Sequence, residues 1–340
     1  MKQKILVTGA AGFIGSHVAE WLLRAGHDVV AVDDLSGWFT RNLPEGVRFF
    51  PIDVADAEAV DELFESEGRF EVIYHLAAYA AEGLSHFIRR YNYTNNVIGS
   101  VNLVNNAVRT EASCFVFTSS IAVYGTNQLP MSEDLVPQPE DPYGVAKYAV
   151  ELDLKAAKEQ FGLDWIVFRP HNVYGERQNI ADRYRNVIGI FMNQLLKEEP
   201  MTVFGDGEQT RAFSFISDVA PVIARAPWVD GARNQVFNVG ADRPYTILEL
   251  GEEIARALDM PARFEHLPAR NEVVHAHASH DRVRAVFGEG DPVSLRDGIA
   301  RMAEWVRTEG VRPTVGYEGL EVTRNFPAAW SHYLGAEASL

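Results

Sequence analysis

The sequence contains little cysteine, relatively few basic residues and no long hydrophobic run. Cys114 is the single cysteine among 340 residues, which excludes an intramolecular disulfide and favours a reducing, cytoplasmic location. The 31 Lys and Arg residues are outnumbered by 47 Asp and Glu, giving a formal net charge of -16. This balance argues against a general affinity for nucleic acid or anionic membranes. An anionic ligand would therefore need a locally basic pocket.

A membrane-spanning segment is not expected, because no run of about 18 apolar residues occurs. The amino-terminal stretch MKQKILVTGAAGFIG has a basic start and an apolar run, as a signal peptide does. Its glycines and the amphipathic continuation SHVAEWLLRAG argue against that interpretation. Internal repeats and low-complexity segments are also lacking. We therefore expect a cytoplasmic protein with no membrane partner.

The first half of the chain alternates short β-branched segments with helical periodicity. Continuous apolar strands are expected at KILVTG, DVVAVDD, EVIYHLAA, CFVFTSS and LDWIVFRP, with helices between them. This pattern is typical of an α/β fold, a doubly wound parallel Rossmann sheet, and we predict a smaller C-terminal α/β substrate domain beside it. We assign residues 1–174 plus about 211–240 to the first domain, and about 175–210 plus 241–340 to the second.

A glycine-rich turn joins the first predicted strand to the first predicted helix. In TGAAGFIG, Gly9, Gly12 and Gly15 permit a tight turn and close approach to a diphosphate at the positive end of the helix. The second strand ends in Asp33, whose carboxylate can accept hydrogen bonds from both adenosine ribose hydroxyls and would repel a 2′-phosphate. The sequence therefore predicts NAD rather than NADP.

Residues that follow the next strands complete the predicted cofactor site. PIDVAD could flank the adenine, and the small residues of HLAAYAA would allow close packing against the cofactor. His75, within that strand, is interpreted as a core residue. Besides the glycines and Asp33, the residues expected against NAD are Phe13, Ile14, Asp53, Val54, Ala77, Ala78 and Tyr79.

A tyrosine and a lysine four residues apart occur in DPYGVAKYAVE. Tyr143 and Lys147 would share one face of a helix. A free tyrosine has a pKa of about 10, so it is a weak base unless a cation such as Lys147 or the nicotinamide ring stabilises its phenolate. Ser120, at the carboxyl end of the strand in FVFTSSIAVYG, would bind the same hydroxyl. These three residues are the predicted catalytic group for oxidising a sugar or alcohol.

Four motifs together carry a resemblance to a known family. TGAAGFIG, SSIAVYG, YGVAK and FGDGEQTRAF resemble the extended short-chain dehydrogenase/reductase family, specifically its nucleotide-sugar epimerases and dehydratases, over residues 1 to about 300. The resemblance implies bound NAD and a nucleoside-diphosphate sugar in the C-terminal half. It also implies a homodimer built from helices around 95–109 and 143–161.

The resemblance further implies roles for several polar residues. Asn96 is similar to an asparagine that fixes the loop by the cofactor. Arg211 and Arg270 resemble arginines that hold the diphosphate, which suits a bidentate guanidinium. Arg89 could recognise a carboxylate, and Arg185 lies in a basic RYR segment whose alternative is a solvated loop. The predicted substrate contacts are thus Ser120, Tyr143, Asn172, Arg185, Arg211, Arg270 and Arg89.

The residues just after Ser120 indicate which reaction follows the first oxidation. Enzymes similar to this chain carry an Asp and Glu pair there when they eliminate water, a Glu when they decarboxylate, and a Cys when they epimerise C3 and C5. Ile121 and Ala122 can exchange no proton. The simplest remaining chemistry is oxidation to a 4-keto sugar, its rotation, and return of hydride to the other face. We therefore expect an NAD-dependent nucleotide-sugar 4-epimerase of the UDP-hexose or UDP-uronic acid type.

Three alternatives stay open at this point. A GDP-mannose 3,5-epimerase-like enzyme is suggested by FRPHNVYG and GDGEQTR, although Cys114 precedes the active end and His171 could be either an acid/base or a packed residue. A 4-keto-sugar reductase or dehydrogenase would consume external cofactor. A non-catalytic NAD-binding regulator would typically have lost the Tyr and Lys pair. No metal is expected, and HAHASH is interpreted as a polar loop before a helix start at Ser279.

Overall fold

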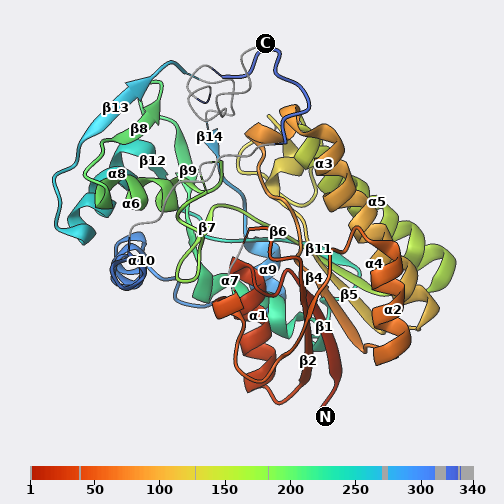
Figure 1. Ribbon diagram of the computed structural model, residues 1–340. Helices are drawn as coiled ribbons and strands as arrows, with labels where there is room; N and C mark the ends of the chain where they lie inside the picture. The colour runs from red at the N-terminus through yellow and green to blue at the C-terminus, as the bar shows by residue number, and fades with distance from the viewer. Residues whose placement is uncertain are drawn as a thin grey trace.

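A seven-stranded parallel sheet forms the centre of the protein, in the order β11-β6-β5-β4-β1-β2-β3 (Figure 1). The computed structural model describes residues 2–37, 40–126, 128–182, 184–269, 275–310, 319–327 and Trp330. The strands of this sheet are β1 (Lys4–Thr8), β2 (Asp28–Asp33), β3 (Arg48–Pro51), β4 (Val72–His75), β5 (Cys114–Thr118), β6 (Trp165–Pro170) and β11 (Gln235–Val239).

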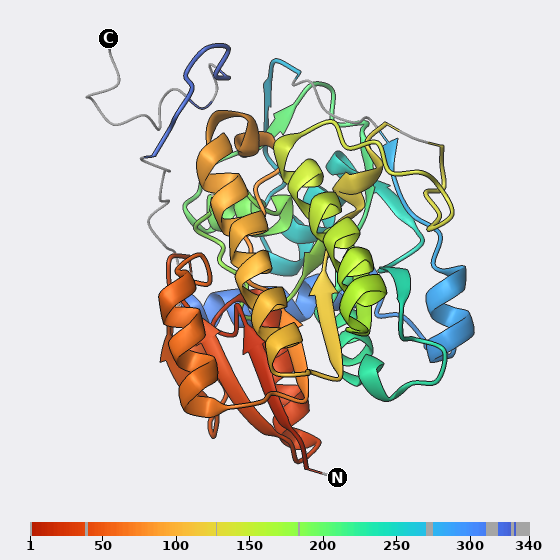
Figure 2. The same ribbon diagram turned by 90° about the vertical axis from the view of Figure 1, so that its right-hand side faces the viewer.

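Helices cover both faces of this sheet, because successive strand residues point to opposite sides. Ile5 and Val7 of β1 face a core shared with α1 (Phe13–Arg24) and α7 (Ile216–Arg225). Leu6 between them faces a second core. That core lies under three helices, which stand in front of the sheet in Figure 2: α2 (Ala57–Glu67), α4 (Gly99–Arg109) and α5 (Pro142–Phe161). The predicted doubly wound α/β class is confirmed.

The C-terminal half adds β11 to the sheet and α7 to the helices that cover it, and most of its other elements lie on the left of Figure 1. Its short strands form three small sheets: β7 (Val173–Tyr174) with β10 (Ser214–Phe215), β8 (Met201–Phe204) with β13 (Phe264–Leu267), and β9 (Thr210–Ala212) with β12 (Pro244–Thr246) and β14 (His275–Ala276). Helices α6 (Val187–Leu196), α8 (Ile247–Leu258) and α10 (Leu295–Glu309) belong to this part. Helix α9 (Asp281–Phe287) instead packs against β11 of the central sheet. The domain boundaries assigned from the sequence stay a prediction.

The connection between β4 and α4 is a series of short helical turns. A 3₁₀ turn (Gly83–Phe87) leads into α3 (Arg89–Tyr93), and a π-helical turn (Thr94–Ile98) continues directly into α4. Such π turns are rare and occur often beside functional sites. The described residues also form 3₁₀ turns at Thr40–Asn42, Ile121–Tyr124 and Ala226–Trp228.

Two further expectations can be compared with the structure. Cys114 starts β5 and is fully buried there, so it precedes the active end of that strand, as predicted. Helix α9 begins at Asp281, shortly after the predicted start at Ser279, whose hydroxyl lies 2.9 Å from an Asp281 carboxylate oxygen. None of the helices in the described ranges is long and apolar enough to cross a bilayer.

Candidate active site

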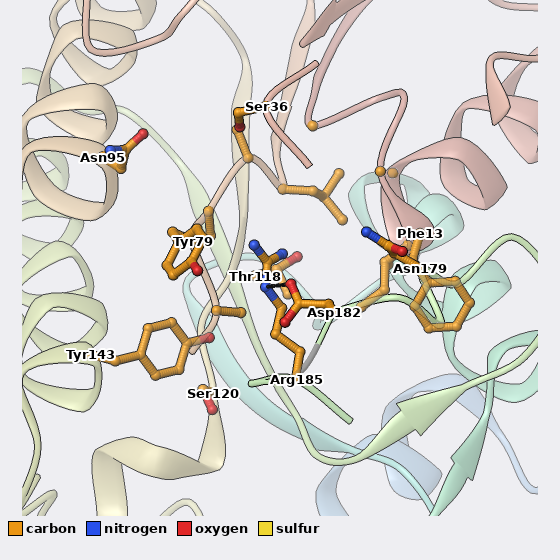
Figure 3. A pocket seen from close by; sticks show the side chains of 18 of the residues that line it. Phe13, Ser36, Tyr79, Asn95, Thr118, Ser120, Tyr143, Asn179, Asp182 and Arg185 are labelled. Carbon is orange, nitrogen blue, oxygen red and sulfur yellow. Dashed lines mark ion pairs between the residues drawn. The ribbon is translucent and has the colours of Figure 1, made fainter. Parts of the chain in front are cut away.

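A pocket of about 370 Å³ opens at the carboxyl end of the parallel sheet, where ligands of such folds bind. In Figure 3, Ser36 lies toward one end and Ser120 and Tyr143 toward the other, with Tyr79 and Arg185 between them. Most of the residues predicted from the sequence line it: Gly9, Gly12, Phe13, Ile14, Gly15, Asp33, Asp53, Val54, Ala77, Ala78, Tyr79, Ser120, Tyr143, Lys147, Asn172 and Arg185.

The glycine turn requires glycine at two positions because of close backbone contacts. Gly9 has a φ of +69°, and a Cβ there would lie 2.7 Å from the Ala77 nitrogen. A Cβ on Gly15 would lie 2.0 Å from the Gly9 carbonyl oxygen. Gly12, at the N-cap of α1, has no side chain to cap the helix, and the first turn carries no acidic residue. The backbone N–H groups at the start of α1 therefore offer a site for a phosphate.

Asp33 is buried at the end of β2, one strand away from the glycine turn. Its Oδ2 accepts a hydrogen bond from the Ala11 backbone N–H at 3.1 Å, and its Oδ1 accepts one from Leu35 at 2.8 Å. Burial raises the pKa of this carboxyl, and the hydrogen bond from Leu35 opposes the rise. Each oxygen has lone pairs beyond these bonds. The glycine turn, the uncapped helix start and this carboxylate therefore fit the diphosphate and ribose of NAD.

Asn96, in the π-helical turn, holds the pocket wall from behind. Its Oδ1 accepts a hydrogen bond from the Tyr79 backbone N–H at 3.0 Å, and its Nδ2 donates to the Tyr79 carbonyl at 3.2 Å. The neighbouring Asn95 lines the pocket. Asn96 thus fixes the backbone of the wall beside the expected cofactor without lining the pocket itself.

Tyr143 and Lys147 are presented by the first turns of α5. Asp141 caps this helix by accepting a hydrogen bond from the Gly144 N–H at 2.9 Å, and Pro142 supplies a φ suited to the first turn. The Tyr143 side chain is hydrogen-bonded to Ser120. One turn later, Lys147 Nζ donates to the Thr118 carbonyl at 2.9 Å and lies 5.8 Å from the centre of the Tyr143 ring. The three predicted catalytic residues thus converge at one end of the pocket.

Burial governs the charge of this group. It raises the pKa of Tyr143 well above the ordinary value, and the hydrogen bond from Ser120 opposes the rise. It lowers the pKa of Lys147 to about 7, and the negative charge of Glu151 opposes the fall. Tyr143 therefore holds its proton in the free protein, and it needs a charged Lys147 to release that proton at neutral pH.

A buried ion pair that the sequence reasoning missed lies behind this group. Glu151 is fully buried and pairs with Arg169 of β6 through two hydrogen bonds of 2.5 and 2.9 Å. Its Oε1 also accepts a hydrogen bond from the Ser119 hydroxyl at 2.6 Å. Arg169 Nη1 donates to the Tyr124 hydroxyl at 2.7 Å. The sequence did contain one indication of this site: Glu151 is four residues after Lys147, so the two side chains share one face of α5.

Comparison with known proteins identifies the family. The family model described as "NAD dependent epimerase/dehydratase family" matches residues 5–240. The chain belongs to this family. A UDP-glucose 4-epimerase of Mycolicibacterium smegmatis is 36% identical over 314 residues, which cover 90% of this chain and 99% of the relative.

Solved structures of epimerases also match 90% of this chain. A UDP-glucose 4-epimerase of Thermotoga maritima, solved with UDP-glucose, gives a TM-score of 0.85 at 32% identity over 90% of this chain and 99% of that chain. A UDP-glucuronic acid 4-epimerase of Bacillus cereus, solved with UDP-glucuronic acid and NAD, gives 0.82 at 28% identity over the same shares. The matched part of this chain therefore has the fold of these epimerases.

The predicted arginines of this epimerase-family protein are not all at the pocket. Arg185 lines the pocket. Its guanidinium lies 4.3 Å from the centre of the Tyr79 ring, and its Nε is 2.9 Å from an Asp182 carboxylate oxygen. The described residues that line the pocket do not include Arg89, which is exposed on α3, or Arg211, which donates to the Thr210 carbonyl at 2.9 Å. Arg270 lies outside the described residues. The diphosphate and carboxylate roles of these arginines stay predictions.

His171 is packed behind the pocket wall. The described lining includes its neighbours Pro170 and Asn172 but not His171 itself. Its Nε2 lies 3.1 Å from Nε2 of His280, whose Nδ1 lies 2.6 Å from an Asp242 carboxylate oxygen. The two imidazole rings are stacked, with centroids 5.1 Å apart. This geometry favours the packed role over the acid/base role for His171.

Two buried histidines make stability depend on pH. Burial lowers the pKa of His75 and of His171 to about 3. An unfolded histidine titrates at about 6.5. Below that value the unfolded chain binds protons that the folded chain does not, so stability falls as the pH drops from about 6.5 toward 3. We expect each histidine to remove about 2 kcal/mol from the free energy of unfolding between pH 7 and pH 5, measured by urea titration.

A substitution at His75 separates its contribution from other groups. Its Nδ1 lies 2.8 Å from the Thr8 hydroxyl and its Nε2 lies 2.8 Å from the Ser100 hydroxyl, so glutamine is the closest uncharged replacement. We expect His75→Gln to flatten the fall in stability between pH 7 and pH 5. An unchanged pH profile in this variant would contradict the assignment.

Proposed function

We propose that this protein is an NAD-dependent nucleotide-sugar 4-epimerase acting on a UDP-hexose or UDP-uronic acid. The observation that carries the proposal is the convergence of Tyr143, Lys147 and Ser120 in a dinucleotide pocket, together with Ile121 and Ala122 in place of any second acid or base. The similarity to 4-epimerases over nearly the whole of their length supports the same reaction.

The proposed residues move one proton in each half-reaction. NAD, held by the glycine turn and Asp33, would supply a reversible acceptor for hydride from the sugar. Tyr143, as phenolate, takes the proton from the C4 hydroxyl as the 4-keto sugar forms, and returns it to the same oxygen when hydride comes back to the opposite face. Ser120 holds that oxygen, and the protonated Lys147 stabilises the phenolate. The carbon regains the hydride it lost, so no external reductant or oxidant is consumed.

A panel of sugar nucleotides tests this proposal. The purified protein is incubated in D₂O, without added cofactor, with UDP-glucose, UDP-galactose, UDP-glucuronic acid, UDP-N-acetylglucosamine and GDP-mannose. We expect proton NMR to show the C4 epimer of a UDP-sugar, with no deuterium at C3 or C5. Loss of water or carbon dioxide, deuterium uptake at C3 or C5, or a stoichiometric need for NADH would refute the 4-epimerase assignment.

An exposed apolar face on α5 supports the proposal that the protein is a homodimer. Val145 and Leu152 are seven residues apart, two helical turns, and are 39% and 47% exposed. Helices α4 and α5 lie side by side on this layer (Figure 2). Apolar side chains repeated along one helix face are typical of an interface.

We expect Leu152→Arg to shift the protein from dimer to monomer, because a charge would be buried in the apolar interface. Light scattering coupled to gel filtration measures the change in mass. Val136→Arg is the matched control, since Val136 is 70% exposed and lies in a loop outside α4 and α5. A dimer that survives Leu152→Arg at micromolar concentration would rule out this face.

A further inference from the structure

A segment that follows α10 packs against the wall of the pocket. We call residues 319–327 and Trp330 the C-terminal strap. Figure 1 shows residues 319–327 in dark blue beside α3. Their backbone joins the turn before α3, because the N–H groups of Glu321 and Val322 donate to the Phe87 carbonyl at 2.8 and 3.2 Å. The strap is therefore bound to the connection between β4 and α4.

Glu321 caps α3 from a distant part of the chain. Its Oε2 accepts a hydrogen bond from the Arg90 backbone N–H at 2.7 Å, and its Oε1 accepts one from Tyr91 at 2.8 Å. No side chain caps α3 from its own N-cap residue, Ile88. A carboxylate on the first free N–H groups of a helix stabilises that helix. The start of α3 thus depends on the strap.

The aromatic side chains of the strap fill a small core beneath the same wall. Trp330 is 6% exposed, and its ring lies edge-on to Tyr184 with centroids 5.2 Å apart. It also packs against Phe326, which in turn lies 4.9 Å from the Phe87 ring. A Cβ at Gly83 would lie 3.2 Å from the Trp330 ring, so the 3₁₀ turn lies directly on it. Removing Trp330 would leave a cavity under this turn.

Three tyrosines connect this small core to the pocket. Tyr79, Tyr91 and Tyr184 all pack against the core and all line the pocket. Tyr91 is hydrogen-bonded to Ser36, which follows β2 and also lines the pocket. Since Asp33 ends β2, the contact between Tyr91 and Ser36 lies beside the expected adenosine ribose. The wall held by the strap therefore contacts the segment after β2 at the expected cofactor site.

We propose that the C-terminal strap retains the bound NAD. Glu321 and Trp330 are positioning residues. Glu321 fixes the start of α3, and α3 holds Tyr91 in its contact with Ser36. Trp330 packs against Tyr184, which lines the pocket. An epimerase must keep its cofactor between the two hydride transfers, and slow release of NAD serves that need. The inference itself rests on the NAD site. Only the stated benefit of slow release rests on the proposed function.

The release rate of NAD from the full-length protein tests this inference. The protein is loaded with NAD, passed rapidly through a desalting column, and sampled over time for bound dinucleotide. We expect Glu321→Ala and Trp330→Ala each to release NAD about tenfold faster than the unmodified protein, the effect of losing a helix cap or a small core contact. Glu321→Gln keeps one acceptor oxygen, so its rate of NAD release should lie between those of Glu321→Ala and the unmodified protein. Val322→Ala, a strap residue 42% exposed, is the matched control and should release NAD at the original rate.

A second measurement distinguishes this role from general destabilisation. Hydrogen exchange of the peptide around residues 84–93 should accelerate in Glu321→Ala and in Glu321→Gln, while exchange in β1 and β5 stays unchanged. Release of NAD at the original rate from Glu321→Ala, Glu321→Gln and Trp330→Ala would overturn the inference, as would faster exchange of the central strands. Neither readout needs turnover, so the two proposals can fail separately. If the Glu321 and Trp330 variants release NAD faster but the unmodified protein epimerises no sugar, only the proposed function is refuted. If the unmodified protein epimerises a sugar but these variants release NAD at the original rate, only the role of the strap is refuted.

Discussion

Tyr143→Phe is expected to lower kcat by about 10²- to 10⁴-fold, the usual contribution of a positioned general acid or base. The substitution removes one oxygen atom from a residue that is 7% exposed, so the pocket keeps its shape. The variant should therefore still bind NAD, which absorbance of the purified protein and mass spectrometry of the released dinucleotide can measure. The rate is followed by NMR of C4 epimerisation with the UDP-sugar that the panel identifies.

Tyr148→Phe is the matched control for this prediction. Tyr148 is on the same helix and packs against a different small core, with Val123 and Met131. Its substitution should leave kcat within about twofold, since surface or partly buried positions away from the reacting atoms tolerate such changes. If Tyr143→Phe epimerises at the unmodified rate, another group must act as the base.

Arg169→Ala is expected to lower the free energy of unfolding by about 3–5 kcal/mol, because it leaves the carboxylate of Glu151 buried without its partner. Both side chains are almost completely inaccessible, at 3% and 0%. The substitution also leaves the Tyr124 hydroxyl without the bond from Arg169 Nη1. Urea unfolding followed by circular dichroism measures the loss.

A double variant separates the unpaired charge from lost packing. Arg169→Met combined with Glu151→Leu replaces the ion pair with apolar groups, so it should recover most of the stability that Arg169→Ala loses. Arg109→Ala, which breaks the exposed pair with Asp61, should leave the unfolding midpoint unchanged. A small effect of Arg169→Ala, similar to that of Arg109→Ala, would contradict the prediction.

The parts of the site that depend on local spacing could be predicted from the sequence. The glycine turn and Asp33 lie at a strand end and a helix start that periodicity alone identifies. Tyr143 and Lys147 share a helix face because they are four residues apart. These local rules also gave the parallel sheet, since apolar strands separated by helices pair in parallel.

The parts that depend on contacts between distant segments could not be predicted. Arg169 and Glu151 are on a strand and a helix, and a sequence does not say which buried arginine meets which buried carboxylate. Arg89 and Arg211 were assigned by resemblance, which gives a position in the chain but not the direction of a side chain. Glu321 caps a helix 231 residues away, and no periodicity indicates such a contact.

The separation between Glu321 and α3 has a consequence for synthesis. A chain emerging from the ribosome folds its local units first, and contacts between distant residues form late. The strands β1 to β6 and the glycine turn can assemble long before residue 321 is made. We therefore expect a nascent chain to hold the cofactor loosely at first, and to trap it only when translation has supplied the strap.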